Sequence, residues 1–120
     1  MPFLQIETSV PASQIPANAV TELIAAVSET VGKPSKFVAV SIRPDVLMGM
    51  GEDASKPCAQ VTLYCIGKMG PEENVAHAKN LTPVLCKVLG LEDDRFYITF
   101  VDKPASEVAW KGTTFQAMKK

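Results

Sequence analysis

One pattern occurs twice along this 120-residue sequence: an apolar stretch with strand character, an amphipathic helical stretch, and a second apolar stretch. The predicted elements are, in order, a strand over 3–9, a helix that Pro16 opens, a strand over 37–42, a strand over 58–66, a helix that Pro71 opens and a strand over 95–101. Two β-α-β units in one chain favour an α+β fold, in which a four-stranded mixed sheet carries both helices on one face. We therefore predict one domain over residues 1–120.

Apolar residues recur at spacings of three and four in both predicted helices, which is typical of a buried face. The stripes are Val20, Leu23, Ile24, Val27 and Val31 in the first helix, and Val75, Ala78, Leu81, Leu85, Val88 and Leu89 in the second. Gly32 and Gly90 are expected to end the two helices. Pro83 is expected to kink the second, because it lacks a backbone N–H. Residues 45–57, between the two copies, are predicted to form a loop.

One face of the predicted sheet is left without helices. Alternation along 58–66 places Gln60, Thr62 and Tyr64 on that face. Such a face is too apolar to stay fully exposed and too polar for a dry core. We therefore expect an oligomer that covers it.

Charge and hydropathy argue against several classes of partner. Twelve Lys and Arg face thirteen Asp and Glu, spread along the chain, so no basic face for nucleic acid is expected. The longest stretch without a charge, residues 8–21, contains two prolines and predicts no membrane span. A targeting signal is not recognised, so we expect synthesis in the cytosol.

The cysteines and the histidine do not form a metal-binding pattern. Cys58, Cys65 and Cys86 have no ligand spacing with the single histidine, His77. We expect free thiols, buried or half-buried, and neither a metal nor a cofactor. His77 is expected to be an exposed or half-buried residue of the second helix.

The amino terminus is the one place where this sequence offers catalytic chemistry. If the initiator Met1 is removed, Pro2 carries a free secondary amine at the start of a strand. Apolar walls and a neighbouring cation, for which Lys33 is a candidate, would lower the pKa of that amine and allow it to act as a base. The simpler interpretation is that Pro2 only begins a strand.

Five short segments carry a resemblance to a known family. They are Met1-Pro2-Phe3-Leu4, Gly32-Lys33-Pro34, Pro57-Cys58-Ala59, Ile66-Gly67-Lys68, and Val108-Ala109-Trp110 with Phe115. Their order and spacing resemble the macrophage migration inhibitory factor and D-dopachrome tautomerase family over essentially the whole chain. The resemblance implies a homotrimer whose sheets surround a central channel. It also implies a cofactor-free keto-enol tautomerase for small aromatic keto acids such as phenylpyruvate, or for dopachrome.

The resemblance also implies individual roles at a site between subunits. Pro2 corresponds to the general base, Lys33 to the lysine that holds the substrate carboxylate, and Ile66 to a residue whose backbone N–H does the same. Tyr97 corresponds to a tyrosine from the adjacent subunit. Thr99 stands where the cytokine branch has an asparagine, with a different hydrogen-bond geometry. The apolar wall corresponds to Val108, Trp110 and Phe115, and Phe37 replaces a tyrosine at the rim.

Three functions stay open. The first is a tautomerase, and the second is a cytokine-like ligand of a cell-surface receptor, present in the cytoplasm and secreted without a signal peptide. These two are compatible, because both are reported for the family. The third is a ligand-sensing module without chemistry. The family's CxxC motif is broken, since Val61 stands three positions after Cys58. The presence of Pro2 and Lys33 favours retained catalysis.

Overall fold

The computed structural model describes residues 1–119. Its main elements are β1 (Pro2–Thr8), α1 (Ala19–Val31), β2 (Ala39–Arg43), β3 (Ala59–Cys65), α2 (Pro71–Leu89) and β4 (Phe96–Asp102), followed by the short β5 (Ala109–Trp110), β6 (Thr113–Thr114) and α3 (Phe115–Met118). Short 3₁₀ turns cover Ala12–Gln14, Ser35–Phe37 and Ala105–Glu107. Among the described residues, no helix is long and apolar enough to cross a membrane.

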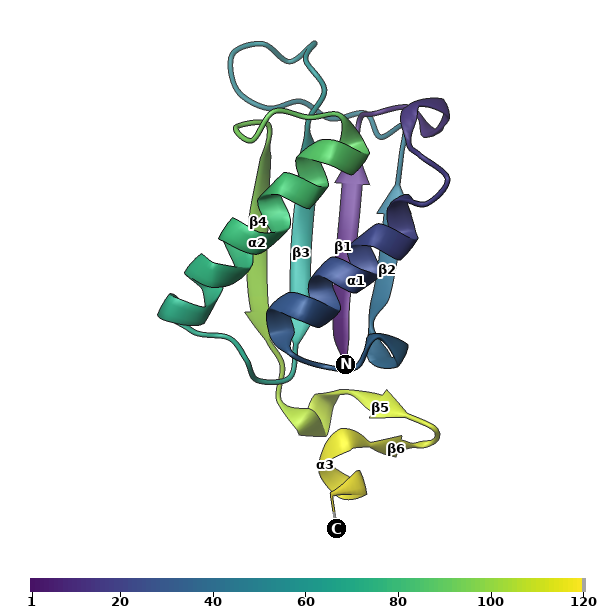
Figure 1. The fold of residues 1–120 in the computed structure, drawn as a ribbon, viewed down its shortest axis with the longest axis vertical. Helices are drawn as coiled ribbons and strands as arrows, with labels where there is room; N and C mark the ends of the chain where they lie inside the picture. The colour runs from purple at the N-terminus through teal and green to yellow at the C-terminus, as the bar shows by residue number, and fades with distance from the viewer. Residues whose placement is uncertain (120) are drawn as a thin grey trace.

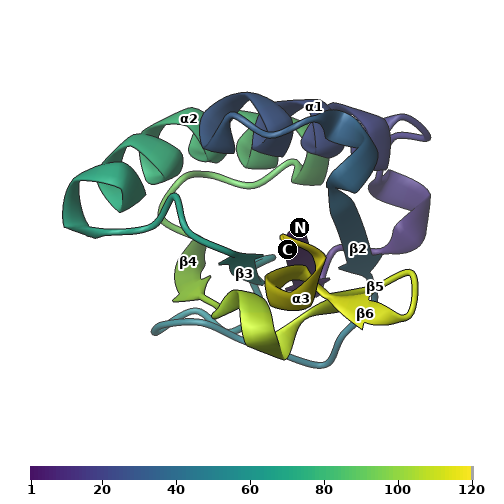
Figure 2. The same cartoon turned by 90° about the horizontal axis from the view of Figure 1, so that it is seen from below.

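The four long strands form one mixed sheet in the order β2-β1-β3-β4. β1 runs parallel to β2 and antiparallel to β3, and β3 runs parallel to β4. Both long helices lie on the same face of this sheet (Figures 1 and 2). The predicted tandem β-α-β fold with its mixed sheet is therefore confirmed.

The core lies between the sheet and the two helices. Side chains on β1 and β3 alternate between fully buried and half-buried positions. The aliphatic core side chains with no exposed surface are Leu4, Ile6, Leu23, Val27, Val61, Leu63, Leu81 and Leu85. Each such side chain contributes roughly 1.5–3 kcal/mol by its removal from water. As predicted, Gln60, Thr62 and Tyr64 lie on the opposite, open face.

The two helices end where the sequence predicts. Gly32 has φ 67° and Gly90 has φ 66°, in the left-handed region that glycine adopts without a Cβ penalty. Their N–H groups donate to the carbonyls of Ser28 and Cys86. α2 also begins at Pro71 as predicted and continues through Pro83 to Leu89.

Two predicted starts are wrong, each next to a proline. Pro16 lies before α1, in a turn in which the Ala19 N–H donates to its carbonyl at 3.0 Å, and the helix begins at Ala19. Phe37 is not in a strand, because the Phe37 N–H donates to the Pro34 carbonyl at 3.1 Å and closes a 3₁₀ turn. β2 consequently begins at Ala39.

Two members of the predicted helix stripes are exposed: Val20 (40%) and Val75 (69%). The first turns of α2 extend beyond β4, where no strand lies beneath them (Figure 1). His77 takes the inward position in this part of the helix and is only 4% exposed. The prediction that His77 is exposed or half-buried is therefore wrong.

His77 is buried because both of its ring nitrogens have partners. Nε2 lies 2.7 Å from the Lys68 carbonyl, and Nδ1 lies 2.9 Å from Thr30 Oγ1. A carbonyl can only accept, so Nε2 carries the hydrogen and Nδ1 accepts from the Thr30 hydroxyl. Asn80 Nδ2 donates to the same Thr30 oxygen at 3.0 Å. His77 thus connects α1, α2 and the loop after β3.

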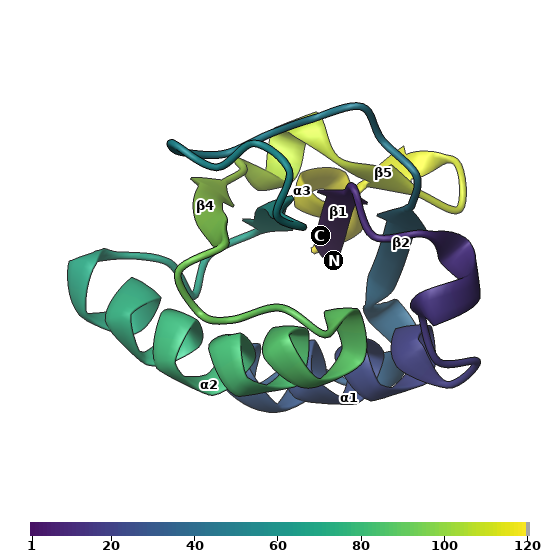
Figure 3. The ribbon, with the colours of Figure 1, turned by 90° about the horizontal axis from the view of Figure 1, so that it is seen from above.

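The long connection between β2 and β3 forms a loop, as predicted, and crosses the end of the sheet on the side opposite the helices (Figure 3). The Arg95 guanidinium donates to four of its carbonyls, at Met50, Asp53, Lys56 and Pro57, over 3.1–3.3 Å. One side chain therefore shapes this loop.

Replacement of His77 should destabilise the fold. We expect His77→Leu to lower the free energy of unfolding by about 1–3 kcal/mol, because it removes the hydrogen bonds that the buried His77 ring makes with the Lys68 carbonyl and the Thr30 hydroxyl. Urea denaturation measures the change. Val75→Ala, on the exposed side of the same helix, serves as the control and should change stability by less than about 0.5 kcal/mol. Equal effects of the two substitutions would contradict this role of His77.

Candidate active site

The amino terminus is held in the middle of the sheet. Pro2 is the first residue of β1, its side chain is fully buried, and its Cα partner on β3 is Cys65. β1 pairs with β2 on one side and with β3 on the other, so the backbone of Phe3 is fixed from both directions. The terminal amine therefore occupies a defined place at the end of the sheet.

Lys33 is brought to the same end by the turn that follows α1. After Gly32, the Lys33 N–H donates to the Ser28 carbonyl at 3.2 Å, and the Ser28 hydroxyl donates to the Lys33 carbonyl at 2.6 Å. The half-buried side chain then reaches β3, where Nζ donates to the Ile66 carbonyl at 2.7 Å. Ile66 directly follows Cys65, the partner of Pro2, so the Lys33 ammonium lies beside the start of β1.

This arrangement acts on the terminal amine. Burial, followed by the positive charge of Lys33, lowers the pKa of the Met1 amino group from its usual value. Both effects disfavour the protonated form. If Met1 is removed, the nitrogen of Pro2 becomes the terminal amine at the neighbouring position of the same strand end.

A cluster of aromatic side chains lies next to this amine. Trp110 on β5 meets Phe37 edge to face, with ring centroids 5.4 Å apart, and stacks parallel to Phe115 at 6.4 Å. The Phe115 N–H donates to the Val108 carbonyl at 3.0 Å, which closes the C-terminal segment onto itself. This segment projects from the end of the sheet at which the chain begins (Figures 1 and 2).

A cavity of about 270 Å³ lies between the amine and this cluster. It is lined by Met1, Lys36, Phe37, Val38, Ala39, Val108, Ala109, Trp110 and Phe115. Mostly apolar walls with a few polar groups are typical of a small-molecule site. The cavity can hold a planar apolar group beside a base and a cation.

Six of the eight residues that the sequence singles out lie at this end of the molecule. Pro2, Lys33 and Ile66 come together at the start of β1, and Val108, Trp110 and Phe115 line the cavity or stack within it. Tyr97 and Thr99 do not join them. Both lie on the open face of β4, opposite Gln60 and Thr62 of β3, and Tyr97 is 65% exposed.

Lys36 lines the cavity, and sequence reasoning missed it. The sequence contains a pattern that could have indicated it, because Lys36 is basic, follows Lys33 by three residues and precedes the aromatic Phe37.

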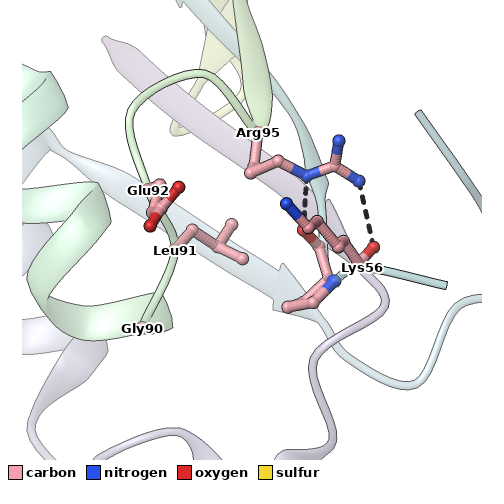
Figure 4. A pocket seen from close by; sticks show the side chains of 6 residues that line it. Lys56, Gly90, Leu91, Glu92 and Arg95 are labelled. Atoms are coloured by element: carbon pink, nitrogen blue, oxygen red, sulfur yellow. Dashed lines mark hydrogen bonds between the residues drawn. The ribbon is translucent and has the colours of Figure 1, made fainter. Parts of the chain in front are cut away.

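A second cavity, of about 250 Å³, lies near the opposite end of the sheet, beside the end of α2 (Figure 4). Its most conspicuous cation is Arg95, whose side chain is occupied by the loop carbonyls described above. Lys56 and Glu92 also line it, and both are exposed. The Arg95 guanidinium of this cavity therefore stabilises the loop and is not free to bind a ligand. Within residues 1–119, no group of three or more His, Cys, Asp and Glu side chains could hold a metal ion.

Fold and site together define a class: a small tandem β-α-β domain with a buried amino-terminal strand end, a lysine beside its amine and an aromatic cavity. Residues 1–116 match the family model described as macrophage migration inhibitory factor (MIF). The chain belongs to the MIF family.

Similar proteins support this assignment in sequence and in structure. The chain is 37% identical to the macrophage migration inhibitory factor of Meriones unguiculatus over 115 residues, which covers 96% of this chain and 99% of that protein. It is also 37% identical to the D-dopachrome decarboxylase of Mus musculus over 114 residues, with 94% and 96% covered. The solved structure of the Trichinella spiralis factor superposes with a TM-score of 0.89 at 32% identity, and covers 93% of this chain and 98% of that one.

Removal of the Lys33 charge should change the titration of the terminal amine. In a preparation that retains Met1, we expect Lys33→Met to raise the pKa of the Met1 amine, so that its titration midpoint moves to higher pH. NMR of a chain labelled at Met1 measures the midpoint. Lys79→Met, at an exposed position of α2, is the matched control and should leave it in place. A midpoint that does not move in Lys33→Met would contradict the electrostatic role of Lys33.

Proposed function

We propose that this protein is a keto-enol tautomerase that acts on small aromatic keto acids, such as phenylpyruvate, and on dopachrome-type compounds, with Pro2 as the general base. The observation that carries the proposal is the place of the chain terminus, beside the Lys33 ammonium and against an aromatic cavity, where burial and Lys33 lower the pKa of the Met1 amine. A neutral amine near pH 7 is what proton abstraction from carbon requires. The mouse relative is named for action on D-dopachrome, which favours the same class of ring-bearing acid.

The reaction moves one proton between two atoms of the substrate. The Pro2 nitrogen takes a proton from the carbon next to the keto group, and the electron pair of that C–H bond forms the carbon–carbon double bond. The protonated amine then returns its proton to the former keto oxygen, which completes the enol. No atom or electron is gained or lost, so no cofactor enters the balance.

Lys33 has donors to spare for the substrate. An ammonium group carries three N–H donors, and the Ile66 carbonyl uses one of them at 2.7 Å. The remaining donors can hold the substrate carboxylate, together with the backbone N–H of Ile66. This would orient the keto acid with its ring toward Phe37 and Trp110. The same apolar walls exclude water and thereby favour the neutral form of Pro2.

The working unit in this proposal is a homotrimer. The open face of the sheet carries half-buried residues such as Tyr64 and the largely exposed Tyr97, which suits coverage by another copy of the chain. Tyr97 lies far from Pro2 in its own chain, so it can contribute to a site only when it comes from an adjacent subunit.

A role as a cytokine-like ligand of a cell-surface receptor is the second candidate function. It is supported by the names of the relatives from Meriones unguiculatus and Xenopus laevis, both of which are macrophage migration inhibitory factors. This role would place the protein in the cytoplasm and, after secretion without a signal peptide, outside the cell. The cavity would then be a vestigial catalytic site or a regulatory site.

Loss of the free Pro2 amine should abolish turnover. We expect Pro2→Gly to lower kcat/KM for phenylpyruvate and dopachrome methyl ester by about 10²-fold or more, as for loss of a general base. As a matched variant, one alanine inserted between Met1 and Pro2 keeps the buried ring but converts its nitrogen into an amide. Mass spectrometry must first show that Met1 is removed from the native chain.

Both variants should lose activity while keeping native circular dichroism spectra. Equal rates for Pro2→Gly and the native chain would exclude Pro2 as the base. The native kcat/KM should also fall as pH falls through the pKa of the Pro2 amine, which we expect burial and Lys33 to lower as they do for Met1. A profile flat down to about pH 5 would count against a neutral amine base.

Assembly should depend on the open face. Sedimentation equilibrium is expected to give three times the chain mass of 12.9 kDa. Tyr97→Glu should lower this mass, because it places a charge in the proposed subunit contact. Val75→Glu on α2 is the control, since Val75 and Tyr97 are exposed to a similar extent in one chain, 69% and 65%. A native chain that sediments as a monomer would contradict the trimer.

A further inference from the structure

Three lysine side chains, from two segments of the chain, lie near the candidate active site. Lys33 lies beside the start of β1, with its Nζ 2.7 Å from the Ile66 carbonyl. Lys36 comes from the 3₁₀ turn before β2, lines the cavity, and has its Nζ 5.1 Å from the centroid of the Phe37 ring. Lys111 follows β5, with its Nζ 4.9 Å from the centroid of the Trp110 ring. Two ammonium groups therefore lie against aromatic rings whose residues line the cavity.

Within residues 1–119, no carboxylate forms an ion pair with these ammonium groups. None of the described residues that line the cavity is acidic. Ion pairs within residues 1–119 involve other cations, namely Arg43, Lys87 and Lys103. The whole chain has a formal net charge of −1, so the cationic character belongs to this site and not to the protein in general. Such a concentration of one charge attracts ligands of the opposite charge.

The backbone holds Lys111 in an unusual conformation. Lys111 has φ 55° and Gly112 has φ 82°, and these two residues form the tight connection between β5 and β6. Glycine, asparagine and aspartate are preferred where φ is positive. Turn chemistry therefore does not favour lysine here, and the same residue places its ammonium against Trp110, which lines the cavity.

We propose that the cavity takes a ring-bearing keto acid with a second carboxylate on the far side of its ring. The proposal rests on the proposed tautomerase and names its substrate class. The keto-acid end lies at Pro2 and Lys33, the ring lies against Phe37 and Trp110, and the distal carboxylate meets Lys36 and Lys111. Aromatic walls with ammonium groups above them suit a ring that ends in an anion, because the ring packs while the anion reaches the cations.

Two matched substrates test this inference. 4-Carboxyphenylpyruvate carries the distal anion, and 4-methylphenylpyruvate has a neutral group of similar size at the same place. The native chain should have the higher kcat/KM for the carboxylate. The ratio of the two kcat/KM values should fall by about two- to fivefold in each of the single variants Lys36→Gln and Lys111→Gln. This is the range expected from the loss of an exposed ion pair. Lys79→Gln, on the exposed side of α2, is the control and should keep the native ratio. Added salt should also weaken the preference.

A binding measurement separates this inference from the proposed function. 4-Carboxycinnamate and 4-methylcinnamate lack the keto group and cannot be turned over. Calorimetric titration with them compares the affinity for a carboxylate and for a methyl group at the far side of the ring. A chain that turns over neither keto acid but still binds the dicarboxylate more tightly, through Lys36 and Lys111, refutes the tautomerase and supports the distal-anion site. The inference is overturned if the native chain does not prefer the 4-carboxy compound to the 4-methyl compound. It is also overturned if the preference is unchanged in the double variant Lys36→Gln and Lys111→Gln.

Discussion

The structure depends on the placement of its first strand in the middle of the sheet. Chain termini usually fray, because few hydrogen bonds hold them. Here β1 has a parallel neighbour on one side and an antiparallel neighbour on the other, and both pairings include Phe3. The terminal amine is therefore attached to one of the most constrained segments of the molecule. A base that must meet a specific carbon atom needs this kind of rigid support.

Lys33 couples the two β-α-β units at the same point. It follows α1 in the first unit and donates a hydrogen bond to Ile66, which follows β3 in the second. His77 reaches the same connection from α2 by its bond to the Lys68 carbonyl, and Thr30 of α1 completes the link. The loop after β3 is thus held from both helices. The position of the Lys33 ammonium beside the amine follows from this shared support.

Periodicity and glycine positions predicted the strands and the ends of the helices, because these features depend on local sequence. Such patterns do not reveal polar partners that are distant in sequence. The burial of His77 was therefore not predicted, because it depends on hydrogen bonds of its two ring nitrogens with Thr30 and Lys68. Val75 was misplaced because periodicity does not reveal where a helix extends beyond the sheet. β5 and β6 comprise two residues each, and the contact between Trp110 and Phe37 joins positions far apart in the chain. Sequence periodicity could not predict these elements. The family resemblance, however, indicated that Val108, Trp110 and Phe115 form the apolar wall of the site.

The open face of the sheet links the site to the proposed assembly. Its row of residues nearest the cavity is apolar and aromatic, with Phe3 between Ala39 and Tyr64, and the Phe3 and Tyr64 rings stack at 6.0 Å. At the opposite end, Glu7 lies beside Arg43 and forms an ion pair with it at 3.3 Å. Coverage by another copy would stabilise this apolar row, because apolar surface gains by leaving water, whereas the Glu7–Arg43 ion pair does not. The end of the sheet that carries the amine thus also has apolar surface to gain from assembly, so the proposed catalysis and the proposed oligomerisation both depend on the start of β1.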